Sequence, residues 1–153
     1  MPQEPQFGNP LPAKGYRDRA AAFGVLEKDG KIAFVRITLN DGTPPFIDLP
    51  GGAIDEGETA QDAVIREFAE ETGLVVEVDG VVGSAAQYFI TSKGEPVNNR
   101  CSFFIVAQGE GAAVKVEDDH ELVWLAFDEG LGALRHDAHA WGLTAWRRAI
   151  AVR

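Results

Sequence analysis

Three glutamates near the middle of the chain have the residue type and spacing that could do chemistry. Glu67, Glu70 and Glu71 stand at positions i, i+3 and i+4, which puts them within an arc of about 100° on one face of a helix. Carboxylates at this spacing repel one another, so a helix that keeps them together is typical of a cation site. No histidine or cysteine is near in sequence, and an all-oxygen ligand set favours Mg²⁺ or Mn²⁺ over zinc.

Two adjacent glycines, Gly51 and Gly52, precede this acidic segment. A glycine lets the backbone approach a ligand closely and aim a carbonyl inward, which a residue with a Cβ does less readily. The loop then enters a helix N-terminus, where free N–H groups favour anionic oxygens. We therefore expect a cation site and a phosphate-binding helix start within one short segment.

Each of these features also has an ordinary structural explanation. A glutamate-rich helix seen alone is most often a solvated face, a Gly-Gly pair is most often a turn, and Arg66 alone could form any surface ion pair. The acidic loop at residues 117–121 stays open between two readings. Either Glu117 or Glu121 supplies a further ligand or general base, or the loop is simply solvated. We expect His120 in this loop to be a surface histidine.

The element that must hold the glutamates is a helix over residues 59–72. Glu58 or Thr59 can cap its start, and Gly73 can end it in the left-handed conformation. Its apolar face, which adjoins the carboxylates, is expected to comprise Val64, Ile65, Phe68 and Ala69. The carboxylates would then border the core.

The rest of the chain alternates between strand-like runs and turn signals. Two runs within residues 19–39 flank Lys28-Asp29-Gly30, which favours a tight hairpin, and prolines make residues 40–45 a loop. Further strands are expected at residues 75–92, 100–108 and 122–127, after a short apolar segment at 46–49. Asp137 is expected to cap a last helix running to about residue 152. Strands mixed with two or three helices predict an α/β fold with a mixed sheet flanked by helices.

Length and composition set the domain organisation. The chain has 153 residues, enough for one compact domain with its own core, and 45% of them are hydrophobic. Residues 1–15 hold four prolines and two glycines, so we expect an extended N-terminal arm there and a single domain over 16–153.

Charge and cysteine content limit the partners. A net charge of −10 argues against binding a nucleic-acid polymer, whereas a small phosphorylated substrate fits if a divalent cation screens the acidic groups. No run reaches the roughly 18–20 apolar residues that span a bilayer, and the N-terminus lacks a signal peptide, so no membrane association is expected. The lone Cys101 lies in an apolar run and is expected to be buried, which fits a cytoplasmic protein.

A family pattern matches the same residues. Gly52, then five residues, Glu58, seven residues, and Arg66 through Leu74 resemble the Nudix box, Gly-x5-Glu-x7-Arg-Glu-U-x-Glu-Glu-x-Gly-U, where U is a bulky apolar residue. Every fixed position is filled, and a chance match of seven specified residues is on the order of one in a million. Phe68 stands where the family more often has an aliphatic residue. The resemblance implies a Nudix-type α/β/α sandwich.

The resemblance also implies roles for individual residues. Glu67, Glu70 and Glu71 look like ligands of Mg²⁺ or Mn²⁺, together with the Gly51 carbonyl. Arg66 looks like the residue that orients the catalytic glutamates, with Glu58 as a supporting carboxylate. The implied reaction is hydrolysis of a diphosphate bond in a nucleoside diphosphate linked to another group, by attack of metal-activated water.

Other functions remain open on this fold. A Nudix-fold module can bind nucleotides or regulate without catalysis, although such modules often lose box residues, and a diphosphate-ester isomerase would need a suitable catalytic cysteine. A homodimer is compatible with each of these functions. Nucleoside triphosphates, ADP-ribose, dinucleoside polyphosphates and nucleotide sugars all fit the box, since residues outside it choose the attached group. Tyr88 and Phe89 are candidates to stack on a base.

Overall fold

The computed structural model describes residues 4–12 and 14–153, so residues 1–3 and 13 of the expected N-terminal arm lie outside the described residues. The elements of the described chain follow in the order β1 (Gln6–Phe7), β2 (Arg17–Lys28), β3 (Lys31–Ile37), β4 (Phe46–Asp48), β5 (Gly51–Ala53), α1 (Ala60–Thr72), β6 (Leu74–Ile90), β7 (Pro96–Ala112), β8 (His120–Leu125), α2 (Phe127–Ala133) and α3 (Asp137–Ala151). None of these helices combines the length and the apolar composition that crossing a membrane requires.

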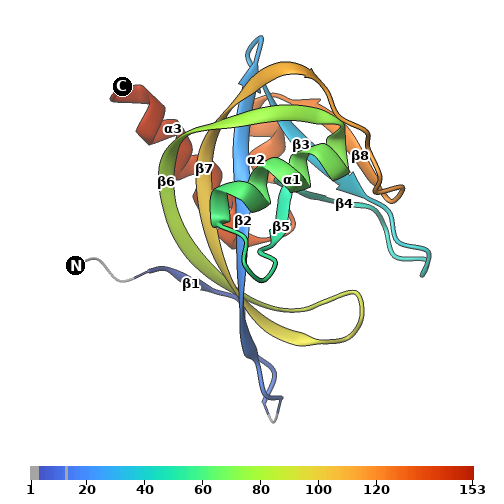
Figure 1. The fold of residues 1–153 in the computed structure, drawn as a ribbon. Helices are drawn as coiled ribbons and strands as arrows, with labels where there is room; N and C mark the ends of the chain where they lie inside the picture. The colour runs from blue at the N-terminus through green and yellow to red at the C-terminus, as the bar shows by residue number, and fades with distance from the viewer. Residues whose placement is uncertain (1–3, 13) are drawn as a thin grey trace.

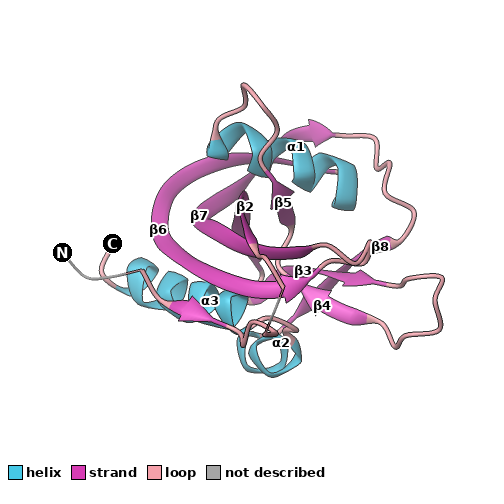
Figure 2. Ribbon diagram, turned by 90° about the horizontal axis from the view of Figure 1, so that it is seen from below, coloured by secondary structure: helices cyan, strands magenta, loops and turns pink. Residues whose placement is uncertain are grey.

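The strands form a mixed sheet that lies between two layers of helix. Its main order is β1-β6-β7-β2-β3-β4, while β5 pairs with β2 and β8 pairs with β3. The pairs β1–β6 and β2–β7 are parallel, and the remaining pairs are antiparallel. The sheet curves strongly, with α1 on one side and α2 and α3 on the other (Figures 1 and 2). The predicted α/β architecture, a mixed sheet flanked by helices, is confirmed.

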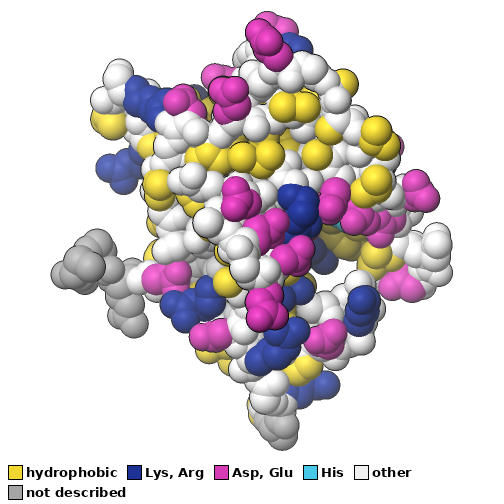
Figure 3. Space-filling model, viewed as in Figure 1, with side chains coloured by type: hydrophobic (Ala, Val, Ile, Leu, Met, Phe, Trp, Pro, Cys, Tyr) yellow, Lys and Arg dark blue, Asp and Glu magenta, His cyan; other side chains and the backbone are white. Residues whose placement is uncertain are grey.

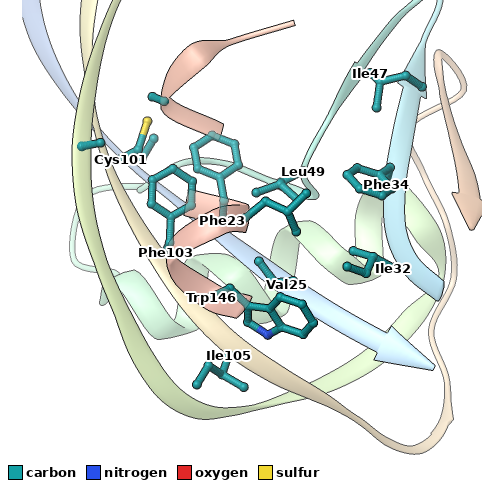
Figure 4. Close-up of a cluster of buried hydrophobic side chains, with 14 residues drawn as sticks. Phe23, Val25, Ile32, Phe34, Ile47, Leu49, Cys101, Phe103, Ile105 and Trp146 are labelled. Atoms are coloured by element: carbon teal, nitrogen blue, oxygen red, sulfur yellow. The ribbon is translucent and has the colours of Figure 1, made fainter. Parts of the chain in front are cut away.

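Alternation along β2 divides the core into two clusters. Phe23 and Val25 point toward α3 and pack with Phe103 and Trp146, as Figure 4 shows. Ala22 and Leu26, on the opposite face of the strand, pack under α1 against its residues Val64 and Phe68. Burying each large apolar side chain contributes about 1.5–3 kcal/mol. The two clusters therefore fix α1 and α3 on opposite faces of the same strand, as the period-2 geometry of a strand requires.

Local sequence signals set the hairpin and the acidic helix. Asp29 and Gly30 both have positive φ, 52° and 78°, which a tight two-residue hairpin turn needs. Thr59 caps α1 through a reciprocal capping box with Asp62, and Gly73 ends the helix at a φ of 76°. The predicted helix over residues 59–72 and the hairpin at Lys28-Asp29-Gly30 are confirmed.

Other sequence predictions need correction. Ile65 is 39% exposed and does not belong to the apolar face of α1, whereas Ala63 is fully buried there. Asp137 does not cap α3, because His136 occupies the N-cap position and makes no side-chain cap hydrogen bond. The last strand, β8, begins at His120, inside the loop that we expected to be acidic and irregular. Short elements such as β5 and α2 carry weak sequence signals and were not anticipated.

The outer edge of the sheet is irregular. β1 covers β6 only through the pairs Gln6↔Ala86 and Phe7↔Gln87. On its other side β6 pairs with β7 over most of its 17 residues, and the register shifts three times, between Leu74/Val76, Val78/Gly80 and Val81/Gly83. These irregularities bend the strand around the helices, as bulges do.

Gly130 supplies a stability test of the packing under α2. A Cβ at Gly130 would lie 2.1 Å from Cζ of Phe34, which is fully buried and cannot move aside. Gly130→Ala is therefore expected to lower the free energy of unfolding by about 1–3 kcal/mol, measured by denaturant titration.

Gly132 is the matched control, because it lies in the same helix and an added Cβ there meets nothing within 4 Å. Gly132→Ala should leave stability unchanged or raise it by up to about 1 kcal/mol. Equal effects of the two substitutions would contradict the close packing of Phe34 on α2.

Candidate active site

Arg66, in the middle of α1, is the centre of a network of carboxylates. Its Nε and Nη2 donate to the two carboxylate oxygens of Glu58, at 2.7 and 3.0 Å. Its Nη1 donates to Glu67 at 3.0 Å and to Glu70 at 3.1 Å, and Nη2 also donates to the Ala53 carbonyl at 3.1 Å. The planar guanidinium thus fixes two carboxylates of the helix and one of the preceding loop in a defined orientation.

The carboxylates respond unequally to this network. Hydrogen bonds from Arg66 and the Asp55 backbone lower the pKa of Glu58 to about 2. Burial and the nearby charge of Glu71 raise the pKa of Glu67 to about 7, although Arg66 opposes the shift. Arg66 thus favours the ionised form of Glu58, whereas burial beside Glu71 disfavours the ionised form of Glu67, which a nearby cation would stabilise.

Glu71 is buried on the side of the helix away from Arg66. Only 5% of the residue is exposed, and its Oε1 accepts the Gly51 N–H at 3.0 Å. A Cβ at Gly51, where φ is 147°, would lie 2.2 Å from the Ala22 carbonyl oxygen. Position 51 therefore requires glycine, because a side chain there would collide with the backbone of β2, to which β5 is paired. The Gly51 amide meanwhile donates to the carboxylate of Glu71.

His120 lies against the same glutamate. Its Nε2 is 3.1 Å from Oε2 of Glu71, and its Nδ1 is 2.7 Å from Oδ1 of Asp119. Burial lowers the pKa of His120, but the hydrogen bonds to Glu71 and Asp119 outweigh it and raise the pKa to about 9. The prediction of a surface histidine is wrong, since only 15% of the side chain is exposed. At neutral pH its imidazolium charge faces a buried carboxylate.

The acidic loop is tied to the C-terminal end of α1. The backbone N–H groups of Val116 and Glu117 both donate to the Glu70 carbonyl, at 2.9 and 3.0 Å. Ligand atoms of Glu117, Asp119 and His120 lie within 4.8 Å of one another. Among the described residues, these are the three side chains whose ligand atoms lie close enough together to share one ion. The carboxylates of the three helix glutamates lie farther apart, because Arg66 holds some of them and His120 holds Glu71.

The two glutamates of the loop have different surroundings. Glu117 belongs to the compact group beside α1, whereas Glu121 pairs with Arg36 at 2.9 Å and its side chain is 65% exposed. The structure therefore brings Glu117 to helix α1, which carries the box, whereas Glu121 pairs elsewhere. On the α1 face of the molecule, acidic side chains surround basic ones (Figure 3).

A cavity of about 220 Å³ extends from this region into the molecule. Its lining includes Gly51, Gly52, Glu71 and His120, together with aromatic and basic side chains such as Phe89 and Arg19. Tyr88, the other aromatic candidate, packs edge-on against Tyr16 with ring centroids 5.3 Å apart and does not line the cavity. The buried Glu71 and the flat ring of Phe89 thus line the same cavity.

The NUDIX domain family model matches residues 15–146. The chain belongs to the Nudix family. An ADP-ribose pyrophosphatase of Methanocaldococcus jannaschii is 33% identical over 99 residues, which are 65% of this chain and 56% of that protein. A putative 8-oxo-dGTP diphosphatase of Bacillus subtilis is 46% identical over 39 residues, 26% of each chain. These alignments span less than two thirds of either relative.

The fold agrees with Nudix structures. A NUDIX hydrolase from Nitrosomonas europaea superposes with a TM-score of 0.69 at 20% identity, covering 87% of this chain and 90% of its own. Within this Nudix chain, the glycine that opens the box has a structural reason: a Cβ at Gly52 would lie 2.9 Å from Oε1 of Glu67. The box glycine thus leaves room for a buried carboxylate that the network of Arg66 holds in place.

Proposed function

We propose that this Nudix-family chain hydrolyses the diphosphate bond of a nucleoside diphosphate linked to another group, with Mg²⁺ or Mn²⁺. The observation that carries the proposal is the complete box in which Arg66 binds Glu58, Glu67 and Glu70 beside a cavity. Residues 16–153 act as a single catalytic domain, which the family match over residues 15–146 supports.

The ligand types of the helix fit a divalent metal, and binding one ion would draw Glu67, Glu70 and Glu71 closer together than their contacts with Arg66 and His120 hold them. Glu67, Glu70 and Glu71 offer only hard oxygen ligands, and the Gly51 carbonyl is a further oxygen of the same kind. A bound cation would offset the burial that raises the pKa of Glu67. These residues would hold the ion. When bound, it would neutralise the diphosphate and lower the pKa of the attacking water.

Other groups of the chain would position the metal ligands and accept the proton of the attacking water. Arg66 holds Glu67 and Glu70 in fixed positions, while His120 and the Gly51 amide hold Glu71. Glu117, tied to the end of α1 by its backbone, is the carboxylate that we propose as acceptor of the water's proton. The cavity binds the group attached to the diphosphate and keeps bulk water from it.

Two other functions fit the structure less well. A non-catalytic nucleotide-binding module has no need for the complete carboxylate network around Arg66. An isomerase that uses Cys101 would need an accessible thiol, but Cys101 is 1% exposed and burial raises its pKa to about 12. The prediction that Cys101 is buried is confirmed.

A substrate panel in ¹⁸O-labelled water tests the proposal. The panel holds nucleoside triphosphates and their oxidised forms, ADP-ribose, dinucleoside polyphosphates and nucleotide sugars, with Mg²⁺ or Mn²⁺. We expect at least one compound to yield two phosphate-containing products, one carrying a single ¹⁸O, with no products when EDTA is present. Absence of hydrolysis across the panel, with nucleotide binding retained, would instead favour the binding module.

A further inference from the structure

A row of polar side chains crosses the sheet beneath the cavity. Arg19 on β2 pairs in register with Asn99 on β7, and Asn99 pairs with Gln87 on β6. Alternation along β2 puts Arg19 on the same face as Ala21 and Phe23, which belong to the apolar cluster under α3. Polar groups on such a face are costly unless they are hydrogen-bonded, so each needs a partner.

Only part of this polar row is satisfied within the protein. Arg19 Nε donates to Oδ1 of Asn99 at 2.8 Å, and Gln87 accepts the Ala138 N–H at 3.0 Å. Among the described residues, no carboxylate lies within 4.0 Å of an Arg19 nitrogen, although Arg19 lines the cavity and its guanidinium lies 5.6 Å from the centre of the Phe89 ring. The terminal N–H groups of Arg19 are therefore available to a ligand.

Asn99 adds donors of the same kind. The residue is 4% exposed and lines the cavity, and its carbonyl oxygen already accepts from Arg19. Its amide NH₂ group can only donate. Arg19 and Asn99 together present hydrogen-bond donors to the cavity, and the matching ligand edge must carry acceptors.

A second buried group on the same wall lacks a partner. His136 is 9% exposed and lines the cavity, and its Nε2 is buried without a hydrogen bond to any described residue. Its ring stands edge-on to Phe89, with centroids 4.8 Å apart. Burial and the charge of Arg135 lower the pKa of His136 to about 3, so the ring is neutral at physiological pH. A buried polar atom without a partner is rare in native proteins and indicates a missing ligand or water.

Flat side chains lie near the polar row in the lining of the cavity. The guanidinium of Arg135 lies 3.8 Å from the centre of the Phe46 ring, and its Nη2 donates to Asp48 at 2.8 Å. Phe46, Phe89 and Arg135 all line the cavity. Aromatic rings and guanidinium planes stack on nucleobases, so the walls suit a planar heterocycle and the polar row suits its edge.

We propose that Arg19 and Asn99 recognise the keto edge of a nucleobase in the group attached to the diphosphate, so that the chain prefers guanine- and hypoxanthine-type nucleotides to adenine nucleotides. The inference rests on the proposed function and names the substrate class of that same site. A 6-keto purine presents two adjacent acceptors, O6 and N7, which match an arginine fork, whereas adenine places an amino donor at that edge. The adenine amino group would face the N–H groups of Arg19, and two donors cannot form a hydrogen bond with each other.

Inosine and adenosine 5′-diphosphates are the probes, because they differ only at the N1–C6 edge. Inosine has a keto oxygen at C6 and an N1–H, whereas adenosine has an amino group at C6 and no hydrogen on N1. Calorimetry with Mg²⁺ should show that the inosine nucleotide binds about 5- to 150-fold more tightly, the range for one bidentate pair. Arg19→Met should reduce this preference to within about threefold. Arg17→Met is the matched control: it removes the same charge from the same strand, but Arg17 pairs with Glu95, is 60% exposed and does not line the cavity.

A second variant tests the same preference independently, in case Arg19→Met impairs folding. Asn99→Asp keeps an acceptor for Arg19 Nε but replaces the free amide donors, so the preference for inosine should fall at least about fivefold while the protein stays folded. Equal affinity for the two nucleotides, or an unchanged preference in Arg19→Met, would overturn the inference. Preferential binding without hydrolysis would overturn the proposed function only, whereas hydrolysis without preference would overturn only the inference.

Discussion

Replacing Glu70 or Glu71 by glutamine is expected to lower turnover at saturating substrate by at least about 100-fold, the usual scale for losing one electrostatic contact of a transition state. Both substitutions remove a charge and keep the shape. The Glu70→Gln amide can still accept from Arg66, and the Glu71→Gln amide can still accept the Gly51 N–H. For Glu70→Gln the loss would therefore report on charge at the proposed metal site. Glu71→Gln also removes the ion-pair partner of His120, so a denaturant titration must show that this variant stays folded. Steady-state rates over a range of Mg²⁺ concentrations would measure it.

Glu56→Gln is the control for this loss of charge, since Glu56 is an exposed residue in the loop before α1. It should retain the wild-type rate. If Glu70→Gln and Glu71→Gln were also fully active, the assignment of the helix glutamates as metal ligands would fail. Partial rescue by high Mg²⁺ would show that weakened ion binding, which mass action can offset, causes the defect.

Glu117→Gln is expected to reduce turnover by about 10²–10⁴-fold, as the loss of a general base does, and to flatten the acid limb of the pH–rate profile. The reason is position: the backbone N–H groups of Val116 and Glu117 donate to the Glu70 carbonyl, which places the loop at the end of the catalytic helix. Metal affinity should change little. The measurement is turnover from about pH 4 to 9 at saturating Mg²⁺ and substrate, a range that reaches the ordinary pKa of a glutamate carboxyl group, about 4.3.

Glu121→Gln provides the comparison within the same loop. Its side chain is 65% exposed and pairs with Arg36, so this variant should keep the wild-type pH profile. If Glu117 were instead a ligand, added Mg²⁺ would partly restore Glu117→Gln. Wild-type rates in both variants would mean that the loop is solvated and that the base lies among Glu67, Glu70 and Glu71 on the helix.

The elements with local signals could be predicted from sequence. The capping box at Thr59, the left-handed Gly73 and the period of the apolar residues all act within a few residues of α1, so its bounds could be predicted to within one residue. The contacts of Arg66 with Glu58 and Glu70 also connect residues within one segment of eight or fewer positions.

Contacts between distant segments could not be predicted. His120 meets Glu71 only because β8 pairs with β3 while α1 packs across the sheet, and no pattern around position 120 reveals either event. The same holds for the cavity wall, where Arg19 and Asn99 come together through parallel pairing of strands 80 residues apart in sequence. Such pairing depends on the whole fold, so the sequence alone predicted the carboxylates of the proposed site and not the cavity wall that we propose selects the substrate.

The partly covered edge of β6 bears on strand pairing between molecules. Exposed strand edges invite intermolecular pairing and aggregation, and proteins blunt them with irregular strands or short covering segments. Here the three register shifts distort β6 up to Gly83, and β1 then covers Ala86 and Gln87. Removing Gln6 and Phe7 would open a regular stretch of edge that ends in Tyr88 and Phe89, an apolar template on which a second chain could add a strand. We therefore expect the short N-terminal strand to limit aggregation as well as to extend the sheet.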